Sequence, residues 1–588
     1  MRTSSQRRLG APVIPTFVGM TYWRTEMNSV KAKDPMKSLL KITLAASLFA
    51  LTACACADDS ADYAQNAITA NGLLKTITVL SSDDFEGRAP GGLGERRSVE
   101  FIQKQFAKIG LKPGNSDGTY LQKVPMVGIQ SNPAMTLKAG GKTTVLNFSE
   151  DFVAFSPRVQ KDVVIDDSEM VFVGYGVIAP EYGWDDYKGM DLHGKTIVML
   201  INDPAIPDPA DPTRLDPNMF KGEAMTYYGR WTYKYEIAAK LGAAAAMIVH
   251  ETKPAGYPFD VVRHSWAHRN FSIDNGGVNP DYPAVPGWLQ LDAAKAMFKS
   301  GGFDFDELKK AALSKDFKPV NLGVTASFKI QNQWEKVQSK NVLGKIEGSD
   351  PQLKNETIIY SAHWDHLGID KSLPGPRTNQ IFHGALDNAS GVAALLELAK
   401  AYKALPVAPK RTILFIATTS EEQGLLGARY YAQHPVYPLN QTLIDINIDG
   451  LNSYGRTRDI SVIGSGKSTV DELAAQVAQQ QGRSTRPDGH PEYGFFYRAD
   501  QFEFAKVGVP GLYTSAGSEV IGKPDGYGTQ KLMDYIANHY HSVHDIVDSS
   551  WDLSGAVQDV QLLFQVGFGV AQGTAYPQWK PDSEFQRK

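Results

Sequence analysis

The sequence predicts an α/β fold, in which helices cover both faces of a mixed, mostly parallel sheet. Three runs of strand length in the C-terminal half, ETIIYSA, RTILFIA and TLIDINI, are apolar almost throughout. Helix-forming stretches such as SGVAALLELAKAYKAL separate these runs. Continuously apolar strands that alternate with helices are typical of a sheet that is buried on both faces. A segment of different character, residues 151–325, precedes this region and predicts a second, mostly β domain.

The overall composition is that of a globular protein with more than one domain. A chain of 588 residues is too long for one ordinary hydrophobic core. Hydrophobic residues make up 42% and charged residues 21% of the chain, which is typical of soluble domains. The net charge is −4 and the chain has no basic run, so nucleic acid is not an expected partner.

Residues 1–57 are expected to be an upstream extension followed by a signal peptide. From Met36, the stretch MKSLLKITLAASLFALTACACADDSA has two lysines, an apolar run and then small residues, which is a secretory signal pattern. Met36 is therefore the expected start. LTAC, ending at Cys54, resembles a bacterial lipobox, whereas cleavage after Ala57 would release a soluble protein. We expect an exported bacterial protein, either a periplasmic or outer-membrane lipoprotein whose lipid anchor is its only membrane contact, or a secreted one.

Three further parts are expected along the chain. Residues 58–150 form the N-terminal part of the main domain, because VEFIQKQFAKIGLKPGN has apolar residues at helical spacing and a Gly/Pro stop. Residues 151–325 contain short β-rich runs and a loop rich in Pro and Asp, which favours a separate module. Residues 326–588 contain the apolar strands of the α/β domain.

Acidic and imidazole side chains follow the ends of the predicted strands. His363 and Asp365 come at the end of the first apolar run, Glu421 and Glu422 after the second, and Asp449 after the third. In open α/β sheets, sites form just beyond the carboxyl ends of the strands. We therefore expect these side chains to gather at one edge of the sheet.

Each of these residues has an ordinary structural interpretation when it is taken alone. Asp387, in HGALDNASG, is a common type of helix cap, and the two glutamates are favoured in the first turn of a helix. His363 is compatible with a hydrogen-bonded core position, and Asp449 before a glycine with a turn. Their coincidence at successive strand ends is what favours a functional site.

A metal centre is the kind of site that these residues predict. The only cysteines, Cys54 and Cys56, lie in the signal segment, so no thiolate ligand is expected in the mature domains. Carboxylates with imidazoles and no sulfur suit zinc, cobalt or manganese in an open, catalytic site. Two such ions about 3.5–4 Å apart form a hydrolytic site.

The motifs together resemble those of a known family. AHWDHLG, GALDNASG, TTSEEQGLLGAR, NIDG and YHSVHDIVD occur in the order found in the M28 family of co-catalytic zinc peptidases, across residues 363–548. SSDDFEGRAPGG, residues 81–92, resembles the N-terminal segment of that family. The module at residues 151–325 resembles a protease-associated (PA) domain inserted into it. The resemblance implies a fold of the zinc-dependent exopeptidase type.

The resemblance also implies a cofactor and its ligands. We expect two Zn²⁺ per chain, for which Co²⁺ or Mn²⁺ are possible substitutes. His363, Asp387 and Asp449 would hold one ion, and Asp387, Glu422 and His541 the other, so that Asp387 is shared. A cis peptide bond after Asp387 is implied as well.

The implied catalytic residues are Glu421, Asp365 and Tyr540. Glu421 would act as general base on a bridging hydroxide or water, Asp365 would hydrogen-bond His363, and Tyr540 would stabilise the oxyanion. The expected activity is removal of N-terminal residues from peptides. The remaining motif residues match no ligand position; they are His366, His539, His544 and Leu386, the last standing where many relatives have a second aspartate.

Other functions stay open at this point. A carboxypeptidase of the same family would need cations for the terminal carboxylate, and Arg498 and Arg230 are the candidates. A metal-free peptide-binding relative and a single-metal glutaminyl cyclase are further alternatives. Phe495–Tyr497 is expected to form a wall of the substrate pocket, and Tyr227–Lys234 to reach over the site. Peptides are the expected partners, and the oligomeric state is open.

Overall fold

The structure is a computed structural model that describes residues 60–266, 269–277, 279–573, 575–581 and 583–586. The chain divides into two units, residues 1–58 and 59–588, and all helices and strands named below belong to the second unit. The predicted signal segment lies outside the described residues. Each helix within the described ranges is too short or too polar to cross a lipid bilayer.

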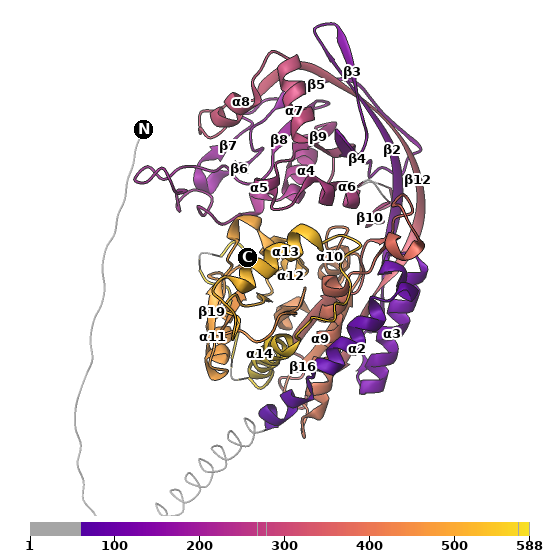
Figure 1. Cartoon of the computed structure of the whole chain (residues 1–588), viewed down its shortest axis with the longest axis vertical. Coiled ribbons are helices and arrows are strands. Elements are labelled where there is room, and N and C mark those ends of the chain that lie inside the picture. Colours follow the sequence, from indigo (N-terminus) through magenta and orange to yellow (C-terminus); the bar gives the residue numbers. More distant parts are fainter. Residues whose placement is uncertain (1–59, 267–268, 278, 574, 582, 587–588) are drawn as a thin grey trace, which may run out of the picture. The chain divides into compact units, whose positions relative to one another are not determined.

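The centre of the C-terminal half is a mixed, mostly parallel sheet (Figure 1). The three predicted apolar runs form its neighbouring parallel strands, in the order β17, β13, β16. β20 continues the parallel set beyond β17, and β12 pairs antiparallel with β16 on the other side. The bounds are β12 (Val320–Ile346), β13 (Thr357–His363), β16 (Thr412–Thr418), β17 (Thr442–Asn447) and β20 (Gly511–Ser515). The predicted fold class is thus confirmed for this region.

Helices cover both faces of this sheet because its strands are apolar on both sides. On β16, Phe415 packs in the core shared with α9 (Ser390–Ala404) and α14 (Ser554–Ala571). The adjacent Leu414 packs in a separate core with residues of α10 (Leu426–Gln433) and α12 (Gln501–Lys506). Neighbouring side chains of a strand point to opposite faces, so a continuously apolar strand needs this double cover.

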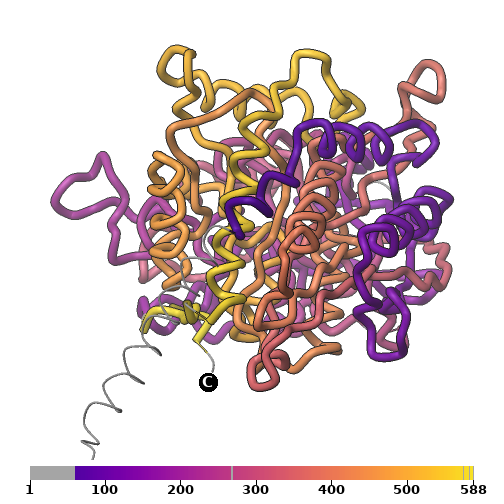
Figure 2. The backbone as a smooth tube through the Cα atoms, turned by 90° about the horizontal axis from the view of Figure 1, so that it is seen from below, coloured from indigo at the N-terminus to yellow at the C-terminus, as the bar shows by residue number. Residues whose placement is uncertain are grey.

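Two N-terminal helices pack against α9. Figure 2 shows these two helices in indigo, beside the segment that contains α9. They are α2 (Ala70–Leu80) and α3 (Leu93–Ile109). The Thr69 hydroxyl accepts a hydrogen bond from the Gly72 N–H at 3.1 Å and so caps the start of α2. The short 3-10 segment η2 (Asp83–Arg88) connects the two helices.

A long two-stranded ribbon connects the C-terminal sheet with the middle of the chain (Figure 1). β2 (Leu121–Ala139) pairs antiparallel with β12 from Leu121 opposite Val342 to Ala139 opposite Val324. One end of β12 pairs with β16, and the other end pairs with β5 (Asp162–Phe172). The sheet therefore runs without a break from one region to the other.

The middle segment has hydrophobic cores of its own and a mostly parallel set of strands at its end of the sheet. Its strands follow the order β5, β8, β9, β11, β4. Helices lie between these strands along the chain, and Met135 and Leu137 of β2 join one of the cores. The PA-like character and the boundaries of residues 151–325 stay predictions. The elements are β3 (Lys142–Leu146), β4 (Phe152–Ala154), β8 (Thr196–Leu200), α4 (Trp231–Lys240), β9 (Ala245–Val249), α5 (Thr252–Ala255), α6 (Phe259–Trp266), β10 (Asn270–Ile273), β11 (Val285–Leu289), α7 (Leu291–Ser300) and α8 (Phe305–Ala311).

The remaining elements are peripheral to both sheets or extend their edges. β18 and β19 lie beyond β20, and α11 packs against β19 and α14. The other short pairs connect loops. Their bounds are β1 (Lys112–Pro113), β6 (Ile178–Ala179), β7 (Trp184–Asp185), β14 (Gly368–Ile369), β15 (Ile381–Phe382), β18 (Asp459–Val462), α11 (Val470–Gln480), β19 (Ser484–Pro487) and α13 (Tyr527–Asn538).

Candidate metal centre

The structure brings the predicted site residues together at the carboxyl edge of the C-terminal sheet. His363 is the last residue of β13, Glu421 and Glu422 follow the end of β16, and Asp449 follows β17. These three strands are parallel neighbours, so their carboxyl ends lie side by side. Asp387 lies in the turn η6 (Ala385–Ala389) that leads into α9, and the peptide bond after it is cis, as expected.

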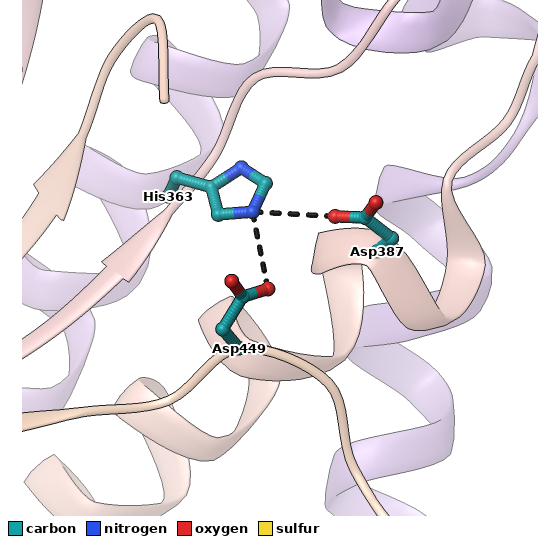
Figure 3. Close-up of side chains that lie close together, drawn as sticks. All are labelled: His363, Asp387 and Asp449. Atoms are coloured by element: carbon teal, nitrogen blue, oxygen red, sulfur yellow. Dashed lines mark hydrogen bonds and ion pairs between the residues drawn. The ribbon is translucent and has the colours of Figure 1, made fainter. Parts of the chain in front are cut away.

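Asp387, His363 and Asp449 form the first cluster of possible ligands (Figure 3). The Nε2 atom of His363 lies 3.3 Å from Oδ1 of Asp387 and 3.3 Å from Oδ1 of Asp449. One atom from each side chain lies within 4.8 Å of the others. Three potential donor atoms therefore converge on one point.

The second cluster uses the other oxygen of Asp387. The Nε2 atom of His541 lies 3.3 Å from Oδ2 of Asp387 and 2.9 Å from Oε2 of Glu422. Asp387 thus faces one histidine with each carboxylate oxygen, which is the arrangement that a carboxylate shared between two cations requires. His541 has a positive φ of 54°, a conformation that a non-glycine residue adopts only when its surroundings hold it there.

His366 also belongs to this second cluster, although its motif position matched no ligand and predicted a structural role or support of a ligand. Its Nδ1 atom lies 2.6 Å from Oε1 of Glu422. Ligand atoms of His366, Asp387 and Glu422 lie within 4.8 Å of one another. Glu422 is therefore flanked by two imidazoles, one at each oxygen. His366 forms an ion pair with Glu422, whereas His541 forms ion pairs with both Asp387 and Glu422.

Glu421 faces His363 of the first cluster, whereas its neighbour Glu422 belongs to the second cluster. Its side chain is buried, with 9% of the residue exposed, and its Oε2 lies 3.9 Å from Nε2 of His363. Its backbone N–H donates a hydrogen bond of 3.1 Å to Oδ1 of Asp365. The Asp365 carboxylate is therefore occupied by the Glu421 N–H. Nδ1 of His363 lies 3.2 Å from the Asp365 backbone carbonyl and 3.7 Å from the Asp365 carboxylate. The expected contact of Asp365 with His363 thus runs through the backbone.

Burial and mutual repulsion shift the pKa values of the carboxyl groups. Burial raises the pKa of Glu421 well above its usual range, and Asp449 and Glu422 add to this rise. Burial acts in the same direction on Asp387, but hydrogen bonds from His363 and His541 hold the pKa of Asp387 well below its usual range. Against burial and the charge of Asp387, the imidazoles of His541 and His366 lower the pKa of Glu422 to about 2.

The donor set fits divalent metal ions. Asp387, Glu421, Glu422 and Asp449 bring four carboxyl groups into one small space, where imidazoles are the only side chains that form ion pairs with them among the described residues. Uncompensated buried charge is unfavourable unless cations balance it. Imidazole nitrogens and carboxylate oxygens are ligands that zinc accepts.

Tyr540 stacks on the second cluster. Its ring centroid lies 3.9 Å from that of His541, and it lines the same cavity as Glu421. The other two histidines of the motif lie outside both clusters, because Nδ1 of His539 faces the backbone carbonyl of His544 at 2.9 Å.

Three residues that the sequence did not single out hold the centre in place, and two of them act on the turn at Asp387. The Asp545 carboxylate accepts hydrogen bonds of 3.0 Å from the N–H groups of Leu386 and Asp387. The Asn388 side chain donates to the Ile448 carbonyl at 2.9 Å, which links this turn to the loop of Asp449. Both residues lie inside the quoted motifs, but an Asn or Asp in a loop gives no sequence signal for this role.

Arg88 is the third. It is fully buried, and its guanidinium donates to four backbone carbonyls around the centre. Burial lowers the pKa of Arg88 to about 10, while Asp545, Asp387 and further acids of the centre oppose this shift. Arg88 therefore stays charged at neutral pH and partly balances the acidic centre.

An α/β sheet with carboxylates and imidazoles gathered beyond its strand ends defines a metal-dependent hydrolase site. Residues 341–565 match the model of peptidase family M28, which covers all the site residues except Arg88. Through this region the chain is similar to peptidase family M28. The family prediction from the sequence is confirmed.

The most similar curated relatives match only over part of their length. Vacuolar membrane proteases of Clavispora lusitaniae and Kluyveromyces lactis are 28% identical over 167 residues and 33% identical over 153 residues. These matches cover 28% and 25% of this chain and 15% of each relative. The chain thus spans about 15% of the length of these relatives.

Solved structures are similar over most of the chain. They include an aminopeptidase from Aneurinibacillus sp. strain AM-1, with 19% identity, a TM-score of 0.48, and coverage of 89% of this chain and 98% of that one. A zinc aminopeptidase from Bacillus subtilis has 16% identity, a TM-score of 0.45, and coverage of 86% and 95%.

The comparison contradicts the predicted localisation. The curated relatives are vacuolar membrane proteases of yeasts, which are eukaryotic proteins and neither bacterial periplasmic proteins nor outer-membrane lipoproteins. The prediction depended on the apolar segment after Met36 and on Cys54, and both lie outside the described residues. A signal-like composition was therefore not sufficient to place the protein.

Proposed function

We propose that the protein is an aminopeptidase that uses two zinc ions to hydrolyse the N-terminal peptide bond of peptides. The observation that carries this proposal is the position of Asp387 between His363 and His541, with one oxygen toward each. Asp449 would complete the first metal position and Glu422 the second. Bound there, the ions would polarise the scissile carbonyl and the attacking water.

The chain's own residues would move the protons. Glu421 lies beside the centre without belonging to either cluster, so its carboxylate is free to take a proton from the attacking water and to return it to the leaving amine. The Tyr540 hydroxyl would donate a hydrogen bond to the oxygen on which negative charge develops. Asp365 would orient Glu421 by accepting a hydrogen bond from its backbone N–H.

The middle segment would cover the site. Tyr227, Arg230 and Trp231 line the cavity that also contains Glu421 and His541. We propose that this PA-like segment limits the size of the substrate to short peptides or peptide ends. Of the predicted pocket wall, Phe496 and Tyr497 pack in one hydrophobic core, and Tyr497 also lines the cavity.

Removal of the metal tests the proposed activity. After treatment with a chelator, we expect the protein to lose hydrolysis of aminoacyl anilides and to regain it with Zn²⁺ or Co²⁺, because the bound ions would supply the positive charge that polarises the scissile carbonyl. N-blocked peptides with a free C-terminus serve as the control. Cleavage of these peptides alone would replace the aminopeptidase by a carboxypeptidase. Activity that survives complete metal removal would contradict the metal centre itself.

A matched pair of histidine variants tests which imidazole is the ligand. We expect His541→Gln to lower the metal content from about two ions to about one per chain, because Nε2 of His541 faces both Asp387 and Glu422. His366→Gln should keep both ions and weaken binding by about 10–100-fold, as is typical for a residue that supports a ligand. Elemental analysis and competition with a chelator measure both quantities. The opposite result would make His366 the ligand.

A further inference from the structure

The cavity beside the metal centre contains two arginines that form no ion pair with an acid among the described residues. It is a cavity of about 140 Å³, and its lining includes Glu421, Tyr540 and His541 as well as Arg230 and Arg498. Arg230 precedes α4 in the middle segment, and Arg498 follows the short turn Phe495–Tyr497. Two segments that are far apart in the sequence thus place one guanidinium each in the same space.

Arg230 is buried and unpaired. Only 7% of the residue is exposed, and its Nε atom is buried without a hydrogen-bond partner within the described part of the chain. Its guanidinium lies 5.9 Å from the Trp231 ring, a contact that leaves its N–H groups available. Burial, followed by the nearby charge of Arg498, lowers the pKa of Arg230 to about 10. A buried cation of this kind is unfavourable until an anion reaches it.

Arg498 is held in place but only partly satisfied. Its Nη2 donates a hydrogen bond of 2.9 Å to the Ala255 carbonyl, and its guanidinium lies 5.1 Å from the Tyr257 ring. Its Nε atom, like that of Arg230, is buried without a partner among the described residues. The Ala255 contact fixes the guanidinium in position, so it is preorganised and not simply mobile.

A third arginine of the cavity is already paired with an acid. Arg429 also lines the cavity, but its Nη2 lies 3.4 Å from Oε1 of Glu503, and Lys506 donates to the same oxygen at 2.9 Å. No such carboxylate pairs with Arg230 or Arg498 in the described ranges. Burial raises the pKa of Asp488, and Arg498 is close enough to oppose part of this rise. The cavity therefore has excess positive charge at the end that holds these two arginines.

We propose that Arg230 and Arg498 bind a carboxylate of the peptide substrate, so that the preferred substrates carry a carboxylate next to the scissile bond. This inference rests on the proposed peptidase function, because the same cavity contains Glu421 and His541. A guanidinium group attracts a carboxylate by its charge and can donate two parallel hydrogen bonds to the two carboxylate oxygens. The carboxylate comes from the C-terminus of a dipeptide or from an acidic side chain on either side of the bond.

Three pairs of peptides distinguish these sources, with the metal-loaded full-length protein. The pairs are Leu-Gly and its amide, Leu-Glu amide and Leu-Gln amide, and Glu-Leu amide and Gln-Leu amide. We expect the carboxylate member of at least one pair to have a kcat/KM about tenfold or more above that of its neutral partner, since hydrogen bonds between charged groups have this magnitude. The pair that responds identifies the source.

Variants assign the preference to the two arginines. Arg230→Gln and Arg498→Gln are each expected to reduce the ratio between the carboxylate and neutral peptides to about one, and Arg230→Lys to keep part of it. Arg269→Gln, at an exposed arginine that pairs with Glu335, is the control and should keep the full ratio. Thermal denaturation confirms that each variant is folded, and Arg498→Gln replaces Arg230→Gln if the latter does not fold.

Calorimetric binding of the same pairs separates this inference from the proposed function. If the neutral peptides are cleaved but every pair agrees within about twofold in rate and affinity, the carboxylate site is wrong and the peptidase stands. If no peptide is cleaved, but the carboxylate members bind about tenfold more tightly and Arg230→Gln removes this difference, the site stands without the peptidase. A preference that survives in both glutamine variants overturns the site.

Discussion

Replacing Glu421 by glutamine is expected to reduce kcat by about 10²–10⁴-fold and to leave the metal content unchanged. Glutamine keeps the size of the side chain but cannot accept a proton at its amide. Glu421 belongs to neither cluster of possible ligands, so its loss should not release an ion. The hydrogen bond from the backbone N–H of residue 421 to the Asp365 carboxylate is also preserved. The loop that follows β16 should therefore keep its position.

The neighbouring residue provides the matched control. Glu422→Gln makes the same substitution at the next residue. It removes a carboxylate whose Oε2 lies 2.9 Å from Nε2 of His541. This variant should lose metal as well as activity. Elemental analysis measures the metal content of both variants, and kcat on an aminoacyl anilide measures their turnover. Together the two measurements distinguish Glu421→Gln from Glu422→Gln. If Glu421→Gln retains normal turnover, Glu421 is not the base; if it loses metal, its place is among the ligands.

The two adjacent glutamates illustrate what a sequence can predict of a site. Neighbouring acids repel each other, so two of them straight after an apolar strand favour a cation close by. The structure shows how their roles can differ, because Ser420 before them and Leu425 after them both have positive φ, at 55° and 61°. This sharp turn lets Glu421 face His363 while Glu422 lies between two other imidazoles.

The sheet and its active edge were predictable for a physical reason. A strand that is buried on both faces needs apolar residues throughout, and this pattern is visible in β13, β16 and β17 without any knowledge of their partners. Polar residues directly after such strands stand out for the same reason. The order of the strands, in contrast, depends on contacts between distant segments.

The parts that could not be predicted depend on long-range contacts of single residues. β12 runs for 27 residues and belongs to both sheets, but its sequence gives no sign that its two ends have different neighbours. His366 lies three residues from His363, and only the folded chain shows that it contacts Glu422. Likewise, an arginine in a polar N-terminal loop, such as Arg88, is normally exposed.

Replacing Arg88 by methionine is expected to lower the free energy of unfolding by roughly 3–5 kcal/mol. This is the range found when one member of a buried charge pair is removed. Arg88 is fully buried and donates to the carbonyls of Trp364, His383 and Gly384 at 2.6–2.8 Å, in addition to Leu80 at 2.9 Å. Methionine fills a similar volume but removes the arginine donor from all four acceptors. The Gly384 carbonyl still accepts from the Ala389 N–H at 3.2 Å, and each buried group that is left unsatisfied costs about 1–3 kcal/mol. It also removes a positive charge that partly balances the acidic centre.

Urea denaturation of the metal-free and the reloaded protein measures this loss. Because the carbonyls need Arg88 whether or not metal is bound, most of the difference should persist in the metal-free protein. Arg377→Met is the control, since Arg377 pairs with Glu86 on the same turn but is 60% exposed, and an exposed pair contributes at most about 1 kcal/mol. A loss in Arg88→Met no larger than in Arg377→Met would mean that water replaces the guanidinium. A loss seen only with metal bound would instead make Arg88 part of the metal centre and not of the fold.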